Sequence, residues 1–177
     1  MNRYLSLLFV CLILFTLSLP GCIKENEEEY EGGNISVNDK LPSLSLALSD
    51  GTDINDEALN GKISVILLFT TSCKDCRQQL PIIERLYKNY FENDNIVIIG
   101  ISRSEGEKSI YDYWQANNLT FPFSPQNDRL VYSLFASSGV PRIYISDRSR
   151  TVKAVFDDNP VASYEKLSSA IDNLLKQ

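Results

Sequence analysis

Two cysteines three positions apart, Cys73 and Cys76, are the residues of this chain best suited to chemistry. They lie in the stretch FTTSCKDCRQQLP. A structural zinc site needs four ligands, and the chain has no histidine and no second cysteine pair, so no metal is expected. A purely structural disulfide across so short a loop would remove little entropy from the unfolded chain. The pair therefore predicts redox exchange, with a redox-active disulfide and no separate cofactor.

The position of the pair between two kinds of element favours this chemistry. Residues 63–69 form an apolar run typical of a buried strand, and residues 76–90 carry apolar side chains at helical spacing. Cys73 is therefore expected at the start of a helix, where unpaired N–H groups and the helix dipole stabilise a thiolate. Cys76, one turn further along, suits a resolving thiol. The lysine and aspartate between them have opposing effects, so the redox potential is left open.

The first 21 residues are typical of a removable export signal. Arg3 supplies a positive charge, and residues 5–19 form an apolar run that is short for a membrane span of about 20 residues. The run ends in Leu-Pro-Gly-Cys, which resembles the bacterial lipobox except for its proline. Residues 1–21 are therefore predicted to be a lipoprotein signal peptide, and the acylated Cys22 to anchor the protein in the lipid bilayer. An uncleaved N-terminal anchor helix is the alternative.

Residues 22–40 are predicted to be a flexible acidic tether, because they are rich in Glu, Asn and Gly and lack apolar periodicity. An acidic run after a lipidated cysteine resembles the signals that send some lipoproteins to the outer face of the outer membrane. A solvated stalk without such a signal is the alternative. The expected location is the cell envelope, with the protein lipid-anchored to a bacterial membrane. We expect the outer membrane, on its periplasmic or surface face.

Residues 41–177 are enough for one domain with a substantial core. The chain has 23 acidic and 17 basic residues and no basic cluster along the sequence, so no nucleic-acid partner is expected. The absence of histidine excludes Ser-His-Asp and Cys-His hydrolases.

The hydrophobic pattern predicts alternating strands and helices. Strands are expected at residues 44–48, 63–69, 95–102, 142–146 and 152–156, and helices at 56–60, 76–90, 108–117, 127–136 and 163–175. The last two strands are joined by a predicted hairpin turn. Pro81 falls inside the second helix, where its missing N–H should produce a kink. This order predicts an α/β fold, a three-layer sandwich with a central mixed β-sheet flanked by helices on both faces.

Three sequence features together resemble the thioredoxin-fold, TlpA/ResA-like, membrane-tethered thiol-disulfide oxidoreductases of the AhpC/TSA-redoxin superfamily. They are GKISVILLFTTSCKDCRQQLP, IVIIGIS and GVPRIYISD. The resemblance covers residues 41–177, which it implies are a thioredoxin-like domain. The resemblance implies that Pro141 is a cis-proline beside the sulfurs and that the Val140 backbone pairs with an incoming peptide. It also implies disulfide-containing exported proteins as partners, and a membrane electron donor that recycles the enzyme.

The resemblance implies a mechanism for the pair. Cys73 attacks a disulfide of an exported protein, Cys76 resolves the mixed disulfide, and the direction of electron flow is left open.

The chain departs from the family pattern near the cysteines. Relatives usually carry an aromatic residue before the first cysteine, where this chain has Ser72. Many carry a buried carboxylate on the preceding strand or three residues after the second cysteine, where this chain has Leu67 and Gln79. Neither side chain ionises, so deprotonation of Cys76 would depend on water or substrate. Glu84 lies on the same predicted helix and is expected at the surface.

Two other functions are weighed. A peroxiredoxin-like thiol peroxidase would carry P-x-x-x-[ST]-x-x-C, and the chain offers Thr70 at the hydroxyl position but Ile66 at the proline position. The arginine such enzymes need to stabilise the leaving oxygen is displaced by one residue, to Arg142. A non-catalytic binding module with a closed disulfide would expose aromatic side chains, and the candidates for that surface are Tyr111, Tyr113, Phe121 and Phe123. At their spacing these aromatics more often pack inside the fold.

Overall fold

The computed structural model describes residues 33–177, so the predictions for residues 1–32, including Cys22, lie outside the described residues. The strands are β1 (Ser45–Ala47), β2 (Asp53–Asn55), β3 (Ile63–Phe69), β4 (Ile96–Ser102), β5 (Phe123–Ser124), β6 (Arg142–Ser146) and β7 (Val152–Phe156). The helices are α2 (Asp56–Leu59), α3 (Lys74–Tyr90), α4 (Glu107–Asn117), α5 (Leu130–Ser133) and α6 (Tyr164–Leu175).

A mixed five-stranded sheet in the order β5-β4-β3-β6-β7 forms the centre of the domain. β4 runs parallel to both β3 and β5, whereas β6 runs antiparallel to both β3 and β7. All seven residues of β3 are buried, which is why its sequence is a continuous apolar run and not an alternating one. The predicted central strand, and the hairpin between β6 and β7, are therefore confirmed.

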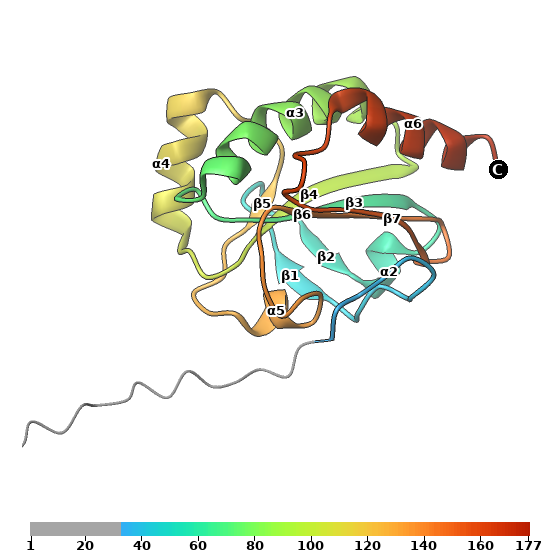
Figure 1. Cartoon of the computed structure of the whole chain (residues 1–177), viewed down its shortest axis with the longest axis horizontal. Helices are drawn as coiled ribbons and strands as arrows, with labels where there is room; N and C mark the ends of the chain where they lie inside the picture. Colours follow the sequence, from blue (N-terminus) through green and yellow to red (C-terminus); the bar gives the residue numbers. More distant parts are fainter. Residues whose placement is uncertain (1–32) are drawn as a thin grey trace, which may run out of the picture.

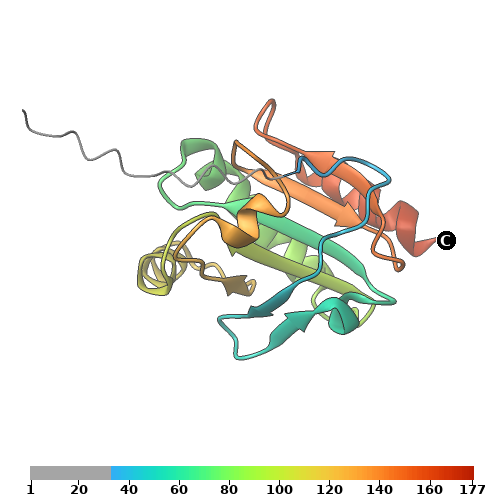
Figure 2. The ribbon, with the colours of Figure 1, turned by 90° about the horizontal axis from the view of Figure 1, so that it is seen from below.

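The sheet is covered on both faces, as the predicted three-layer sandwich requires. Helices α3 and α6 cover one face, whereas the β1–β2 hairpin, α2 and α5 cover the other (Figure 1). The view from below looks onto the face covered by the β1–β2 hairpin, α2 and α5, with α3 and α6 behind the sheet (Figure 2). Tyr90 on α3 donates a 2.6 Å hydrogen bond to Asp172 on α6, which joins the two long helices.

An aromatic cluster packs α4 against the edge of the sheet. The ring centroid of Trp114 lies 5.1 Å from that of Phe69, 5.0 Å from Phe121 and 4.9 Å from Phe123. The indole N–H of Trp114 also donates to the carbonyl of Phe121 at 2.9 Å. Phe121 and Phe123 are thus core residues, and Tyr111 is the large aromatic of this region that stays mostly exposed. The prediction that these aromatic side chains pack inside the fold is therefore confirmed for Phe121 and Phe123.

Several element bounds differ from the predicted ones. The helix predicted at residues 127–136 is the short α5, because Asp128 accepts the N–H of Leu130 and starts the helix late, and turn hydrogen bonds replace it from Leu134 onward. α3 begins at Lys74 and continues through Pro81. β2 and β5 are three and two residues long, too short for a periodic pattern to reveal.

The chain before β1 lies along the domain. The Ile35 N–H donates to the Phe135 carbonyl at 2.9 Å, and the Asn38 N–H donates to the Val152 carbonyl at 2.8 Å. Lys40 forms an isolated β-bridge with Thr151. In the described part of the chain, no helix is both long and apolar enough to cross a membrane.

Candidate active site

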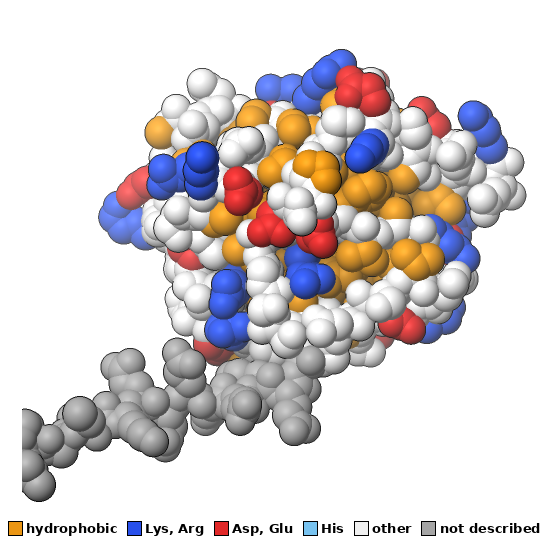
Figure 3. Space-filling model, viewed as in Figure 1, with side chains coloured by type: hydrophobic (Ala, Val, Ile, Leu, Met, Phe, Trp, Pro, Cys, Tyr) orange, Lys and Arg blue, Asp and Glu red, His pale blue; other side chains and the backbone are white. Residues whose placement is uncertain are grey.

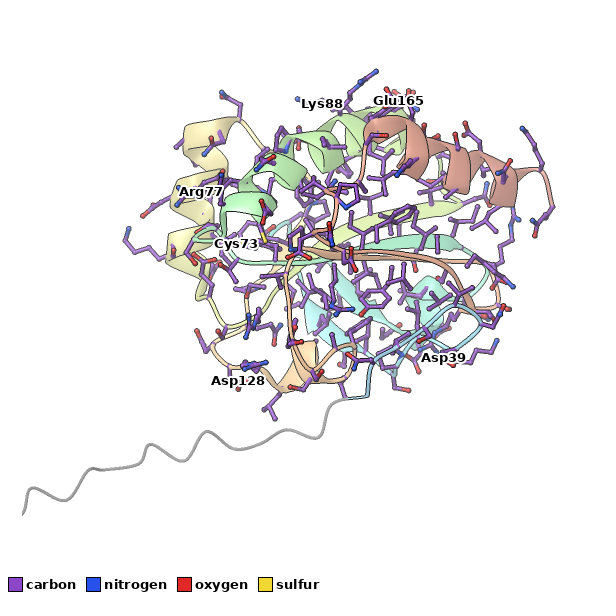
Figure 4. The ribbon with its side chains drawn as sticks, in the orientation of Figure 1. Asp39, Cys73, Arg77, Lys88, Asp128 and Glu165 are labelled. Atoms are coloured by element: carbon purple, nitrogen blue, oxygen red, sulfur yellow. The ribbon has the colours of Figure 1, made fainter. Side chains whose placement is uncertain are left out.

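Cys73 lies where the central strand gives way to the longest helix. β3 ends at Phe69, a short turn follows, and Cys73 is the N-cap of α3. Its sulfur accepts a hydrogen bond from the backbone N–H of Cys76 at 3.4 Å, so it satisfies one of the unpaired donors at the helix start. The side chain is partly exposed, and Figure 4 shows it at the start of α3. The predicted location of Cys73 is confirmed.

Cys76 is fully buried on the first turn of α3, and both cysteines are free in this structure. Burial raises the pKa of the Cys76 thiol, and the nearby Cys73 sulfur and the Asp75 charge raise it further. A backbone hydrogen bond from Thr70 acts in the opposite direction. Cys73 is therefore the more accessible of the two sulfurs, and Cys76 is enclosed by the protein.

The segment before β6 brings its backbone against Cys73. The Cys73 thiol donates to the carbonyl oxygen of Val140 at 3.4 Å, although the two residues are 67 positions apart. The Val140–Pro141 peptide bond is cis, as the family resemblance implies. The fold thus brings together Cys73, Cys76, Val140 and Pro141, the four residues predicted for catalysis and substrate binding.

Glu105 holds the turn before Cys73 in place, and sequence reasoning missed it. Its carboxylate accepts the Thr71 N–H at 2.7 Å, the Thr71 hydroxyl, and the Ser109 hydroxyl at 2.6 Å. Arg77 adds a 2.5 Å hydrogen bond to the Thr71 carbonyl. The available signal was the position of Glu105 just after a parallel strand, since the carboxyl ends of β3 and β4 lie at the same edge of the sheet.

Leu67 and Gln79 occupy the positions where relatives place a carboxylate, and both are fully buried. Gln79 forms two hydrogen bonds with the backbone of Ala162: its amide N–H donates to the Ala162 carbonyl at 3.2 Å, and its oxygen accepts the Ala162 N–H at 3.0 Å. The amide thus ties α3 to the segment before α6. It supplies no proton acceptor at this position.

The expectation that Glu84 lies at the surface is wrong. It is 6% exposed, and its carboxylate accepts the N–H and hydroxyl of Thr120 at 2.7 Å each and the N–H of Phe121 at 3.2 Å. Burial alone would raise its pKa, but the hydrogen bonds from Thr120, Lys88 and Phe121 hold that pKa below its usual range. Glu84 stays charged because remote backbone donors reach it, and it makes no hydrogen bond to either cysteine.

Neither side chain that a peroxidase would need is hydrogen-bonded to Cys73 within residues 33–177. The Thr70 hydroxyl pairs with that of Ser72 at 2.7 Å, and Arg142 donates from Nε to the Ser138 carbonyl at 2.9 Å. The same described residues contain no group of three or more potential metal ligands. The site is thus built around a pair of sulfurs and the backbone groups that contact them.

Comparison with known proteins assigns the chain to a family. The AhpC/TSA family matches residues 37–155. The chain belongs to the AhpC/TSA family. The thiol-disulfide oxidoreductase ResA of Oceanobacillus iheyensis is 22% identical over 146 residues, which cover 81% of this chain and 75% of ResA. The thioredoxin-like protein YneN of Bacillus subtilis is 29% identical over 89 residues, which cover 50% of this chain and 52% of YneN. The chain thus spans about half the length of YneN.

The solved structures agree on the fold. A solution structure from Bacteroides thetaiotaomicron, provisionally assigned as a protein disulfide isomerase, superposes with a TM-score of 0.75 at 21% identity. The match covers 82% of this AhpC/TSA chain and 94% of that one. The fold is thioredoxin-like, and the enzyme class predicted from the sequence, a ResA-like thiol-disulfide oxidoreductase, is confirmed.

Proposed function

We propose that this AhpC/TSA protein is an extracytoplasmic, lipid-anchored thiol-disulfide oxidoreductase that exchanges disulfides with exported proteins through Cys73 and Cys76. The observation that carries the proposal is the environment of the Cys73 sulfur. It is partly exposed, and it contacts both the N–H of the resolving residue Cys76 and the carbonyl of Val140. A client peptide bound along the Val140–Pro141 edge would therefore reach Cys73 before Cys76.

In the first step the Cys73 thiolate attacks one sulfur of a client disulfide. A bond forms between Cys73 and that sulfur, the client disulfide breaks, and the second client sulfur leaves as a thiolate that takes up a proton. The N–H of Cys76 stabilises the Cys73 sulfur as an anion before the attack.

In the second step Cys76 attacks Cys73. Cys76 loses its proton, the Cys73–Cys76 disulfide forms, and the first client sulfur leaves as a thiolate that takes up a proton. The client has gained two electrons and two protons, and the enzyme has lost the same number. Run in reverse, the steps oxidise a client dithiol, so the direction depends on which partner restores the enzyme. For reduction of clients, that partner is a membrane electron donor.

The proposed location rests on the N-terminal sequence. Cleavage before Cys22 and acylation of this cysteine would hold the catalytic domain on the membrane surface of the cell envelope. Radiolabelled palmitate supplied to expressing cells should label the wild-type protein but not a Cys22→Ala variant. Equal labelling of the two proteins would contradict the anchor and leave the redox chemistry untouched.

Two variants test the chemistry. Cys73→Ser should abolish reduction of insulin disulfides, because no nucleophile remains at the exposed position. Cys76→Ser should accumulate mixed disulfides with clients, since the first step proceeds and the second cannot. These adducts are read on non-reducing gels before and after dithiothreitol.

Hydrogen peroxide consumption serves as the control assay. A peroxidase would consume hydrogen peroxide at a rate that depends on Cys73. The proposed enzyme should instead reduce insulin disulfides faster than it consumes peroxide. A Cys76→Ser protein that captures no client, together with Cys73-dependent peroxide turnover, would overturn the proposal in favour of the peroxidase.

A further inference from the structure

Three arginines that are distant in sequence converge beside the candidate active site. Arg103 follows β4, Arg129 precedes α5, and Arg142 begins β6. The guanidinium carbons of Arg103 and Arg129 lie 5.1 Å and 5.3 Å from the ring centroid of Tyr132. Arg142 lies beside Gly139, since a Cβ at Gly139 would be 3.7 Å from its Nε, and the Gly139 carbonyl is the acceptor of the Tyr132 hydroxyl. The charges of all three arginines oppose the rise that burial causes in the Tyr132 pKa. We call Arg103, Arg129 and Arg142 the arginine cluster.

No acidic side chain neutralises the arginine cluster within the described residues. The four ion pairs of residues 33–177 involve other cations: Lys88, Lys108, Arg150 and Lys153. The Nε atom of Arg129 is buried and has no hydrogen-bond acceptor. Three like charges held close together without a counterion repel one another, so an anion that binds among them gains from all three.

Backbone carbonyls fix the orientation of two of these guanidinium groups. Arg129 donates from Nη2 to the Ser137 carbonyl at 2.9 Å, and Arg142 donates from Nε to the Ser138 carbonyl at 2.9 Å. Each group thus uses some of its five donors on the protein and keeps others for a ligand. Planar, pre-oriented guanidinium groups are well suited to bind carboxylates.

The arginine cluster and the reactive sulfur share one segment of backbone. The Tyr132 hydroxyl donates to the Gly139 carbonyl at 2.8 Å. The next residue, Val140, accepts the Cys73 thiol at 3.4 Å. A peptide lying along Val140 and Pro141 with its cysteine at Cys73 would therefore bring its neighbouring residues close to the arginines. In Figure 3, Lys and Arg side chains lie at the surface in the region of α5.

We propose that the arginine cluster is a docking surface for client proteins whose reactive cysteine is flanked by acidic residues. The inference rests on the proposed function, because it names the class of substrate that this site prefers. The formal net charge of the chain is −6, so the chain as a whole repels an acidic client at long range, and the local cluster must supply the recognition. Acidic clients should therefore react faster, and salt should reduce the advantage.

The chain itself contains a competing anion. Five glutamates lie between residues 25 and 31, shortly before the described chain begins. Asn34 accepts the N–H of Ser137 at 3.2 Å, and Ser137 is also the residue whose carbonyl binds Arg129. The described chain thus begins near Ser137, and the test must separate the preceding glutamates from a client.

The test compares two synthetic peptides that differ only in having four glutamates or four glutamines around a single cysteine. That cysteine is supplied as its disulfide with 4-thiopyridine. Attack by Cys73 on the peptide sulfur forms the mixed disulfide and releases 4-thiopyridone, whose absorbance gives the rate by stopped flow. The protein is the reduced chain from residue 22 onward with Cys22→Ala, so that Cys73 and Cys76 are its thiols. It is used in three forms: otherwise wild-type, with Arg103→Gln/Arg142→Gln, or with Lys166→Gln/Lys176→Gln. The last is the control, since it removes the same charge from the distant helix α6 and its C-terminal residues.

The expected result is a rate about tenfold higher for the glutamate peptide than for the glutamine peptide at low salt, with the ratio falling toward one at high salt. The Arg103→Gln/Arg142→Gln variant should lose most of this ratio, and the lysine control should keep it. The ratio stays informative even if the arginine variant is partly misfolded, because misfolding slows both peptides alike.

Three outcomes would overturn a part of the reasoning, and each points to a different part. Failure of both peptides to react would refute the proposed function. Equal rates with wild-type protein would refute the docking surface alone. A several-fold rise in the glutamate-peptide rate when the five glutamates of residues 25–31 become glutamine would show that this segment occupies the arginine cluster, and would overturn its assignment to clients.

Discussion

Replacing Gln79 with glutamate restores the carboxylate that relatives carry and tests how this chain manages without one. In the protein, the amide both donates to and accepts from the Ala162 backbone, and its side chain is fully buried. A protonated glutamate can make the same two hydrogen bonds. An ionised glutamate cannot donate, so it leaves the Ala162 carbonyl unpaired and places a negative charge beside it.

The loss of folding stability follows from the pKa of the introduced glutamate. Burial and the adjacent carbonyl should raise the pKa of this glutamate by roughly 2 units from its usual value of about 4.3. Because the folded-state pKa is raised, stability is complete below the unfolded-state value and is lost as the pH rises through the folded-state value. Relative to wild type, the free energy of unfolding should fall by about 1 kcal/mol near pH 5 and by about 3 kcal/mol near pH 8.

Urea unfolding of the reduced proteins at both pH values measures this difference. Gln79→Ala is the matched control, because it removes both hydrogen bonds at every pH and should lose about 3 kcal/mol at each. An equal loss for Gln79→Glu at the two pH values would refute the reasoning, since it would mean that residue 79 is not in a buried, carbonyl-facing site. A second measurement is the rate of Cys73–Cys76 disulfide formation, which should increase in folded Gln79→Glu if the new carboxylate accepts the Cys76 proton.

Two further substitutions test buried contacts, one on α3 and one on β4. Glu84→Gln should lower the free energy of unfolding by about 2 kcal/mol near neutral pH, measured by urea unfolding, because an amide cannot satisfy the donors from Thr120 with both of its ends. Since the folded-state pKa of Glu84 is lowered, its contribution is present above the unfolded-state value and lost as pH falls through the folded-state value. The difference between the two proteins should therefore shrink in acid, and a constant difference would contradict this role. Gly100→Ala should cost about 1–3 kcal/mol and lower the thermal midpoint, because its Cβ would lie 2.9 Å from a ring carbon of Phe69; an unchanged midpoint would mean that the ring moves freely.

The parts of the fold that follow from local pattern were predictable. The continuous apolar run at residues 63–69 specified a strand buried on both faces, and it became the central strand β3 with the expected bounds. Cys73 fell at a helix start because it stands between that run and a helical period. The cis bond at Pro141 was predicted from the family resemblance and not from any property of the local residues.

Buried polar side chains were not predictable, because their partners are remote. In the sequence, Glu84 and Gln79 are both polar residues within a predicted helix. One meets the N–H groups of Thr120 and Phe121, and the other meets both backbone groups of Ala162, 83 residues away. No periodic pattern reports where such backbone donors will lie. The arginine cluster was missed for the same reason, since a run of basic residues is visible in sequence and a convergence of separated ones is not.

The proton of Cys76 shows how these details meet in the chemistry. Burial raises the pKa of the thiol, and the two positions where relatives hold a carboxylate are occupied here by leucine and glutamine. Among the described residues, the one contact that favours the anion of this sulfur is the backbone hydrogen bond from Thr70. The second step must therefore pass the proton to water or to the departing client thiolate. A client whose thiolate is basic assists that transfer but leaves more slowly, whereas an acidic thiol leaves faster and assists less. Acidic residues around a client cysteine raise the pKa of its thiol, so the substrates that the arginine cluster favours are those best able to remove the Cys76 proton.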